Sequence, residues 1–559
     1  MKKYLLIAVL SFVYQAKSQQ FRWAHALGNG IGNGVAYDNF QNCVVTGFFS
    51  GTVDFDPGPA VDTITSKGNY DIFVAKYDVN GNYMWAFGIG SNAYATSQAV
   101  SIDASGNIAI TGWFQGTADF NPGPAVNNLN PHGYESLFLA KYDPNGNYLW
   151  AFSLGDTTAT VQENGTSLSF DISGNILLTG AFQDTIDFDP GPAVHKLGAD
   201  SFPDTYVAKY NANGNYLWAF KVGSPSGCIG YALSSDKNGN ILVTGSFGNT
   251  TDFNPGPAVN NLTAKGLSDI FIAKYDAGGN YLWAFSIGAN GGWSQAQTWS
   301  IASDTFGNVL ATGYFGGNAD FDPGSGVHML SGGTESGFLA KYDANGNYKW
   351  AFKNSSGVGT SVAADIGSNI LLTGGFKGVG NFNPSGTNNL TAIGNEDLFL
   401  ARYDSSGNYV WAFNAGCSGK TNEGMSVSCD KNGNIWITGQ LSSGNVDVDP
   451  GSAIYYLSAG SPQNSFIAKY NSKSMGIRQQ NNEDNYMNAF PNPSDGNITI
   501  GINETNPGHL TVFNQTGEKV FETTVTNNYL KVNLPVSGVY QIVFTSSVGV
   551  SVKKIIIAK

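Results

Sequence analysis

The motif Asp-Phe-Asp-Pro-Gly is the feature of this sequence with the clearest chemical potential. Two carboxylates separated by one residue, in a loop that also contains glycine, can ligate Ca²⁺, a hard cation that prefers oxygen. The motif, with valine in place of phenylalanine in its last copy, therefore predicts weak calcium sites at four pairs of residues: Asp54 and Asp56, Asp187 and Asp189, Asp320 and Asp322, and Asp447 and Asp449.

The same motif has a structural interpretation that needs no metal. Asparagine replaces the second aspartate at Asn121 and Asn254, and both aspartates at Asn381 and Asn383. Asparagine keeps the oxygen that caps a turn but loses the charge that attracts a cation. The later ligands and the terminal glutamate of a full calcium loop are missing as well. The sequence therefore leaves open whether these residues bind calcium or only cap turns.

A second candidate site lies in an amide-rich stretch around two tryptophans. Trp293 and Trp299 stand outside the repeated tryptophan pattern of the chain, and Asn290, Gln295 and Gln297 accompany them. Aromatic rings stack on sugar faces while amide groups hydrogen-bond to sugar hydroxyls. These five residues are therefore predicted to bind a glycan. The alternative is that the two rings pack over the edge of a sheet.

Catalytic residues do not assemble from the sequence. The five histidines are scattered, and none stands with cysteine, aspartate or glutamate at the spacing of a metal site or a nucleophile–base pair. No catalytic residue is predicted, and a non-enzymatic role is favoured. Two carboxylates that converge at the mouth of a central channel would favour a hydrolase or lyase instead, whereas a purely structural surface protein would have no concave polar pocket.

One basic residue recurs in every repeat of the chain. Because an active site in a pseudo-symmetric ring is usually asymmetric, a residue that occurs in every repeat is interpreted as structural. We predict that it pairs with loop carboxylates inside its own repeat. The positions are Lys76, Lys141, Lys209, Lys274, Lys341, Arg402 and Lys469.

Internal repetition determines the fold class. Tyr-x-Trp-Ala-Phe recurs with tryptophans 61 to 68 residues apart, at 85, 150, 218, 283, 350 and 411, and residues 21–25 are a diverged copy. Thr-Gly recurs seven times, and Ala-Lys-Tyr six times with Ala-Arg-Tyr as a seventh copy. Each repeat is interpreted as four antiparallel strands joined by Gly-containing turns. Seven such units predict an all-β fold, a seven-bladed β-propeller.

The order of the pieces predicts how this propeller closes. The chain begins with an aromatic strand, residues 21–27, that no inner strand precedes, and the last repeat lacks its aromatic strand. We therefore predict that residues 21–27 pair with residues 465–470 and complete the seventh blade, which hides two sheet edges. The two tight turns of each blade then fall on one face, and the long connections and crossovers fall on the other, where a ligand is expected.

The repeat resembles a known family. The pattern Asp-x-x-Gly-Asn-Ile-x-x-Thr-Gly, followed by Phe-x-Ala-Lys-Tyr-Asp-x-Asn-Gly-Asn-Tyr-x-Trp, is similar to the bacterial β-propeller repeats of many secreted proteins and covers residues 21–470. The resemblance implies the fold. It implies no single activity, because that repeat family has none.

The C-terminal segment, residues 488–559, contains six short strand patterns that predict a small β-sandwich. It resembles the type A C-terminal sorting domain of the type IX secretion system of Bacteroidetes. The matching residues are Pro491, Asn492, Pro493, Gly517, Gly538, Tyr540, Lys553 and Lys554. The resemblance implies handling by the type IX secretion machinery and a secreted or outer-surface location.

The remaining features complete the domain plan. Residues 1–18 carry a Lys-Lys start, an apolar run and a small-x-small site, which predict a signal peptide. Residues 19–470 are the predicted propeller and residues 471–487 a polar linker, with no transmembrane segment in the mature chain. The net charge of −13 argues against nucleic-acid binding. A glycan or protein ligand is expected, and pairing of Cys417 with Cys429 is left open.

Overall fold

The structure is a computed structural model. It describes residues 20–155, 164–199, 202–289, 295–333, 335–354, 356–460, 463–471, 487–502, 508–514, 519–525, 529–534, 536–545 and 550–558. The chain divides into two compact units, Lys17–Ser472 and a second unit that contains Lys473–Lys559. The predicted signal peptide and most of the predicted linker lie outside the described residues. Every regular element within the described ranges is a strand, and no helix there could span a bilayer.

Four strands make up each repeat of the first unit, and they pair antiparallel in chain order. The inner strands are β1 (Gln20–Tyr37), β7 (Ala95–Ile102), β13 (Asn164–Phe170), β19 (Cys228–Ser235), β25 (Ala296–Ser303), β31 (Gly357–Ala364) and β37 (Glu423–Cys429). The second strands are β2 (Cys43–Phe49), β8 (Ile108–Phe114), β14 (Ile176–Phe182), β20 (Ile241–Phe247), β26 (Val309–Phe315), β32 (Ile370–Phe376) and β38 (Asn434–Leu441).

The third and fourth strands complete these sheets. The third strands are β5 (Asp71–Tyr77), β11 (Ser136–Tyr142), β17 (Asp204–Tyr210), β23 (Asp269–Tyr275), β29 (Ser336–Tyr342), β35 (Asp397–Tyr403) and β41 (Asn464–Asn471). The aromatic fourth strands are β6 (Tyr83–Ile89), β12 (Tyr148–Leu154), β18 (Tyr216–Val222), β24 (Tyr281–Ile287), β30 (Tyr348–Asn354) and β36 (Tyr409–Ala415).

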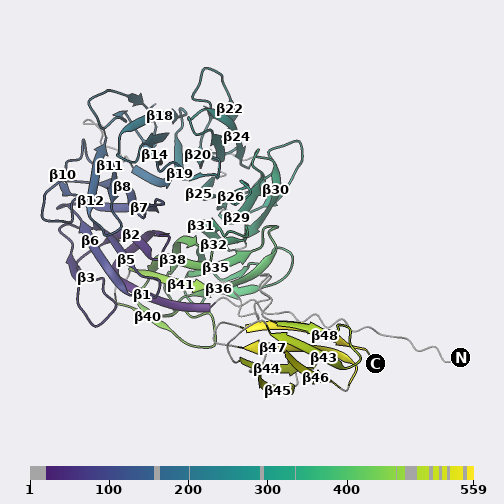
Figure 1. Ribbon diagram of the computed structural model, residues 1–559. Helices are drawn as coiled ribbons and strands as arrows, with labels where there is room; N and C mark the ends of the chain where they lie inside the picture. Colours follow the sequence, from purple (N-terminus) through teal and green to yellow (C-terminus); the bar gives the residue numbers. More distant parts are fainter. Residues whose placement is uncertain are drawn as a thin grey trace. The chain divides into compact units, whose positions relative to one another are not determined.

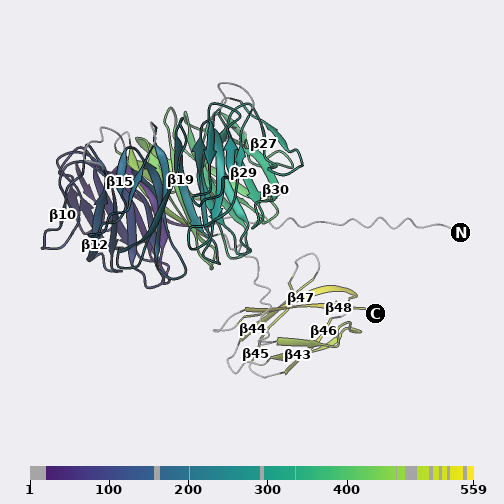
Figure 2. The same ribbon diagram turned by 90° about the horizontal axis from the view of Figure 1, so that it is seen from above.

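The sheets surround a central space, with β7, β19, β25 and β31 next to it and β12 and β30 at the periphery (Figure 1). Figure 2 gives the view from the side, in which the paired strands β29 and β30 run next to one another. This is the arrangement of a β-propeller. No sheet among the described residues closes on itself, because each has an inner and an outer edge. Neighbouring sheets are therefore held together by side chains.

Strand β1 belongs to two sheets at once. Its first part pairs with β41, from Gln20 opposite Asn471 to Asn29 opposite Asn464, and its second part pairs with β2. The predicted pairing of residues 21–27 with residues 465–470 is thus present. The sequence did not indicate that the same strand runs on without interruption into the next sheet. Gly28, with φ +82°, lies where the two halves meet.

The long connections are more ordered than expected. Each carries a two-stranded hairpin around the Asp-Phe-Asp-Pro-Gly motif, where the sequence predicted a long connection and no strands. The hairpins are β3 (Thr52–Asp54) with β4 (Thr63–Thr65), β9 (Ala118–Asp119) with β10 (Asn128–Leu129), β15 (Thr185–Asp187) with β16 (Lys196–Gly198), β21 (Thr250–Asp252) with β22 (Asn261–Thr263), β27 (Asn318–Asp320) with β28 (Met329–Ser331), β33 (Val379–Asn381) with β34 (Asn389–Thr391), and β39 (Gly444–Asp447) with β40 (Tyr456–Ala459).

The repeated Thr and Tyr residues tie each repeat together. The threonine hydroxyl of every Thr-Gly pair donates to a carbonyl on the third strand, as Thr312 does to Phe338 at 2.7 Å. The tyrosine hydroxyl of every Ala-Lys-Tyr copy donates to the carbonyl in the middle of the Asp-Phe-Asp motif, as Tyr342 does to Phe321 at 3.1 Å. Both hydroxyls are buried, so losing either would leave a carbonyl unpaired. The motifs are therefore a hydrogen-bonded scaffold.

The repeated basic residues join neighbouring repeats. Lys341 Nζ contacts Asp304 Oδ2 at 2.9 Å and also donates to the carbonyl of Ser405 in the next repeat at 2.9 Å. The predicted pairing with a carboxylate of the same repeat is confirmed, and the structure places that carboxylate in the tight turn after the inner strand. The equivalent pairs are Lys76 with Asp38, Lys141 with Asp103, Lys209 with Asp171, Lys274 with Asp236, and Arg402 with Asp365.

Arg402 is the one arginine among the seven repeated basic residues, and the strand order of the repeat that follows it explains why this position differs. The lysines reach the turn between the third and fourth strands of the following repeat. After Arg402 that turn does not exist, because β41 and β1 are not joined in the chain. Lys469 in the last repeat donates to the carbonyl of Val79 in the first repeat at 2.9 Å. The contact between repeats therefore runs across the ends of the chain.

The four cysteines are free thiols, so Cys417 and Cys429 do not pair in the structure. Cys43, Cys228 and Cys429 are buried. Burial raises the pKa of the Cys228 thiol to about 12. These three side chains contribute to the hydrophobic cores of their sheets.

The second unit is a sandwich of two antiparallel sheets over one hydrophobic core. One sheet contains β42 (Met487–Phe490), β43 (Asn497–Ile502) and β46 (Tyr529–Asn533). The other contains β44 (Gly508–Phe513), β45 (Lys519–Val525), β47 (Gly538–Thr545) and β48 (Val550–Ile557).

The sorting-motif residues meet across this sandwich. Asn492, between Pro491 and Pro493, accepts the N–H of Ile556 through Oδ1 at 2.8 Å. Tyr540 is buried two residues after Gly538 and donates to the carbonyl of Val536 at 2.9 Å. Lys553 and Lys554 lie on β48, opposite Ile542 and Gln541. Gly517 lies outside the described residues. The two ends of the motif are thus neighbours in space.

The lysine–aspartate contact predicts a selective loss of stability. Asp304 is 4% exposed and Lys341 is 2% exposed. Burial alone would raise the pKa of Asp304, but hydrogen bonds from Asn308 and Lys341 and the charge of Lys341 hold it below its ordinary value. Asp304→Asn leaves a buried ammonium without a counter-charge, which we expect to cost about 3–5 kcal/mol in urea unfolding at neutral pH.

Asp343→Asn is the matched control. Asp343 makes the same turn hydrogen bonds from Asn345 and Asn347 but pairs with no buried lysine, and Asn211 fills its position naturally in another repeat. The pKa of Asp304 is lowered, so the charge contributes stability above the unfolded pKa of about 3.9, and that stability is lost as the pH falls through the folded value. The difference in the free energy of unfolding between the parent and Asp304→Asn should therefore become smaller in acid. An equal effect of both substitutions would contradict the assignment.

Candidate functional site

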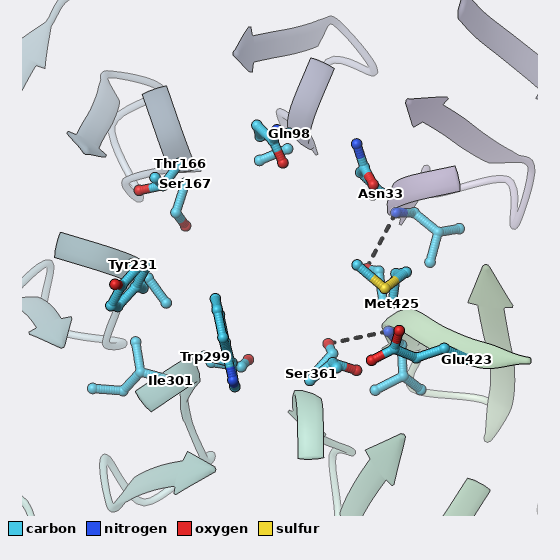
Figure 3. A pocket seen from close by; sticks show the side chains of 18 of the residues that line it. Asn33, Gln98, Thr166, Ser167, Tyr231, Trp299, Ile301, Ser361, Glu423 and Met425 are labelled. Atoms are coloured by element: carbon cyan, nitrogen blue, oxygen red, sulfur yellow. Dashed lines mark hydrogen bonds between the residues drawn. The ribbon is translucent and has the colours of Figure 1, made fainter. Parts of the chain in front are cut away.

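A cavity of about 850 Å³ occupies the central space of the first unit. All the inner strands contribute to its wall (Figure 3). A volume in this range suits a small-molecule or oligosaccharide ligand. Polar side chains such as Asn33, Gln98 and Thr166 line it together with apolar ones, which distinguishes the cavity from the hydrophobic cores inside the sheets.

One residue in each inner strand is re-aimed by a β-bulge. The pairing of every inner strand with its second strand shifts register at the same point, for example between Thr298 and Ser300. A bulge leaves one residue without a cross-strand partner and turns its side chain. The bulge residues are Asn33, Gln98, Thr166, Tyr231, Trp299, Thr360 and Met425, and all of them line the cavity.

The residues on either side of each bulge pack against the neighbouring sheet. At Gly165, which precedes the bulge residue Thr166, a β-carbon would overlap the hydroxyl of Thr111 in the neighbouring repeat. Ser361, which follows the bulge residue Thr360, accepts the N–H of Val427 in the next inner strand at 3.1 Å. The flanking residues are thus small because neighbouring sheets touch there. Three of the bulge residues also contact the neighbouring inner strand: Asn33 Nδ2 donates to the carbonyl of Ser97, and the hydroxyls of Thr166 and Thr360 donate to the carbonyls of Gly230 and Gly424.

The aromatic bulge residues form one side of the cavity. Trp299 is 40% exposed and reaches toward the middle of the space, between Tyr231 and Ile301 on one side and Ser361 on the other (Figure 3). Its ring centroid lies 5.1 Å from that of Tyr231 and 6.5 Å from that of Tyr314. Gln297 Nε2 donates to Tyr231 Oη at 3.1 Å. An exposed indole supported by two phenol rings can stack on a flat ligand.

The structure therefore brings together part of the predicted glycan site. Trp299 lies in the cavity and Gln297 orients Tyr231 beside it. Gln295 forms an isolated bridge with Ser268 and does not line the cavity. Asn290 and Trp293 lie outside the described residues.

Charged side chains cluster where the long connections meet the cavity. Glu335 and Glu396 directly precede β29 and β35, Lys377 directly follows β32, and Glu423 begins β37. Lys377 Nζ lies 3.6 Å from Glu396 Oε2. Glu423 Oε2 accepts from Gln440 Nε2 at 3.3 Å. Burial and the charge of Glu396 raise the pKa of Glu423, against the opposing effects of Gln440 and Lys377.

The sequence did not single out these carboxylates or Tyr231, because each is an isolated polar or aromatic residue in a strand-rich chain. The sequence feature that could have identified them is that these residues do not recur at the same position in the other repeats. Glu423, Tyr231 and Trp299 all stand at positions where the other repeats carry different residues. Only the bulges show that several of these variable positions face one space.

The carboxylates of the predicted calcium sites accept backbone hydrogen bonds that cap turns. Asp320 Oδ1 accepts the N–H groups of Asp322 and His328, and Asp322 Oδ1 accepts that of Gly324, at 2.8–3.1 Å. The pairs Asp54 and Asp56, Asp187 and Asp189, and Asp447 and Asp449 make the same bonds. Within the described ranges, no three His, Cys, Asp or Glu residues gather as a metal site. Calcium binding stays a prediction.

Comparison with known proteins identifies the second unit. Residues 488–558 match the secretion system C-terminal sorting domain family. This domain indicates export through the type IX secretion system to the cell surface or the extracellular space.

The first unit is similar to several proteins of diverse origin. The chain is 27% identical over 503 residues, which cover 75% of its length, to an uncharacterized WD repeat-containing protein of Acanthamoeba polyphaga mimivirus. It is 28% identical over 174 residues, 31% of its length, to the regulatory protein FlaEY of Caulobacter vibrioides. The aligned parts span only 36% and 17% of those two relatives.

Solved structures with a similar arrangement include the Dos1 propeller. That likeness has a TM-score of 0.39 and 10% identity, and it covers 81% of this chain and 95% of the other. A protein of unknown function from Bacteroides caccae matches with a TM-score of 0.28 and 12% identity, covering 61% and 89% of the two chains.

The separation of scaffold from cavity makes a prediction about stability. Gln98 is a bulge residue that projects into the cavity, so Gln98→Ala should change the free energy of unfolding by less than about 0.5 kcal/mol. Thr373 is buried and donates to the carbonyl of Phe399 at 2.7 Å. Thr373→Val keeps the shape but leaves that carbonyl unpaired, which should cost about 1–3 kcal/mol. Urea unfolding of both variants checks this, and a reversed order would contradict it.

Proposed function

We propose that this exported protein is a non-enzymatic binding module whose ligand, a glycan, occupies the central cavity. The observation that carries the proposal is the exposed Trp299 ring inside a polar cavity. An exposed tryptophan in a concave site is costly in water unless a ligand covers it, and sugar faces are suitable partners.

The other bulge residues support a polyhydroxylated ligand. Gln98 offers an amide donor and acceptor, whereas Asn33, Thr166 and Thr360 offer acceptor oxygens, because their donor groups already bind carbonyls of the neighbouring inner strand. These groups surround the space on strands rather than on loops, so they are held in place before a ligand arrives. The presence of a concave polar pocket also argues against a purely structural role.

The site requires a continuous wall, and we propose that the wall is a seven-bladed ring closed by β1. The pairing of β1 with β41 and the bond from Lys469 to Val79 support closure. Ser426 of β37 also accepts the N–H of Val35 of β1 at 3.3 Å, as serines do between other neighbouring inner strands.

An enzymatic role is the second candidate, because the carboxylates Glu396 and Glu423 line the same cavity. Burial and the charge of Glu396 raise the pKa of Glu423, and a carboxyl group with a raised pKa can act as a general acid. Release of reducing sugars from a polysaccharide by the parent protein, lost in Glu423→Gln, would favour this function over simple binding.

Trp299 should dominate ligand affinity. A glycan array probed with the purified mature chain identifies binders, and titration calorimetry then compares Trp299→Ala with the parent. Loss of one stacking platform should weaken binding at least about tenfold, or about 1.4 kcal/mol. Phe306→Ala is the control, because Phe306 is 69% exposed in the turn that follows β25 but does not line the cavity. Equal affinities of all three proteins would refute the assignment.

If β1 closes the ring, its first ten residues should be essential for the stability of the propeller and for its monomeric state. A chain that starts at residue 30 loses the buried Trp23, Ala24 and Leu27 and exposes the edge of β41. Compared with a chain that starts at residue 19, it should melt at lower temperature and associate through that edge. A synthetic peptide of residues 19–29 should restore both properties. A stable monomer without the peptide would argue against a closed ring.

A further inference from the structure

The charge of the central cavity carries information about its ligand. Four charged side chains line it, the acids Glu335, Glu396 and Glu423 and the base Lys377. Lys377 lies beside Glu396, at 3.6 Å between Nζ and Oε2. Among the described residues that line the cavity, no positively charged side chain therefore lies at salt-bridge distance from Glu335 or Glu423.

Of the three carboxylates, Glu335 lies next to the aromatic side of the cavity, whereas Glu423 lies beyond Ser361 as seen from Trp299 (Figure 3). The pKa of Tyr314 is raised by burial and by the charge of Glu335. The ring centroid of Tyr314 is 6.5 Å from that of Trp299. Negative charge and ring faces therefore occupy the same part of the wall. Both attract a cation, the first by direct charge and the second through the ring quadrupole.

The net charge of the whole protein also favours a cationic ligand over an anionic one. Its net charge is −13, so a polyanion meets repulsion both at a distance and inside the cavity. Partial burial of Glu423 and the neighbouring charge of Glu396 raise the pKa of Glu423, so a cation placed there would relieve a real cost. The hydroxyl and amide bulge residues on the other strands match sugar hydroxyls better than they match apolar side chains.

We propose that the cavity selects an oligomer of amino sugars, with Glu335 and Glu423 receiving ammonium groups of different sugar units while Trp299 stacks on a sugar ring. This inference rests on the proposed function and refines it. Neutral sugars would lack the ionic contact, and uronic or sulfated sugars would be repelled by the same carboxylates.

Titration calorimetry of the mature chain with three soluble probes tests the proposal. The probes are oligomers of glucosamine, of N-acetylglucosamine and of galacturonic acid, which differ in charge at similar size. The glucosamine oligomer should bind about tenfold more tightly than its acetylated counterpart, and the acidic oligomer should not bind. Raising the salt from about 50 mM to about 0.5 M should weaken only the first interaction.

Glu423→Gln separates charge from shape. Glutamine can still accept from Gln440, so the wall should be retained, which the unfolding midpoint checks. Affinity for the glucosamine oligomer should fall about tenfold while that for the acetylated oligomer should not change. Asp276→Asn is the matched control, because it removes one charge from an exposed turn away from the cavity.

The outcomes distinguish this inference from the function on which it rests. Equal binding of charged and acetylated oligomers, both lost in Trp299→Ala, would overturn cation selection and leave glycan binding in place. Preference for the acidic oligomer would also overturn it. A lysine-rich peptide that binds through Glu423 when no sugar does would overturn both proposals, as would no binding of any probe.

Discussion

The structure depends on one requirement, which is that every open four-stranded sheet must be held against its neighbours by side chains. The buried lysine of the third strand meets it with a single ammonium. In one repeat that ammonium contacts Asp304 and the carbonyl of Ser405, and so connects a turn of its own sheet with a turn of the next. A buried ammonium is tolerated only with such partners, so the contact enforces both the geometry of the repeat and its distance from the next one.

The same requirement explains why the inner strands look as they do. Small residues (glycine, serine, alanine or threonine) flank each bulge because neighbouring strands approach closely there, as at Gly165 against Thr111 and at Ser361 against Val427. The bulge residue between them lines the cavity. Scaffold and site therefore alternate along a few residues of the same strand. Chemical variety is possible at Gln98, Trp299 or Met425 without loss of the fold.

The repeats made most of the architecture predictable. The sequence patterns predict strands over residues 309–315, 497–502, 538–545 and 550–557, and β26, β43, β47 and β48 have these bounds, because turn glycines and alternating apolar residues mark their limits. The small hairpins around the Asp-Phe-Asp motif were missed, since two to four residues per strand give no alternation to detect. The pairing of Lys341 with a carboxylate of its own repeat was predicted, but the sequence did not identify which loop supplies it.

The sequence alone determined that the protein is all-β and built from repeats, because local turn chemistry and strand periodicity carry that information. The resemblance of its C-terminal motifs to a known family also identified the secretion sorting domain. The sequence also identified Trp299 as an exception to the repeat. Only the tertiary structure decided that Trp299, Tyr231 and Glu423 share one cavity. Tyr231 and Trp299 reach the cavity because each is the bulge residue of its inner strand, whereas Glu423 reaches it from the start of β37. The three strands are far apart in the chain, and only the packing of the sheets around the central space brings them together.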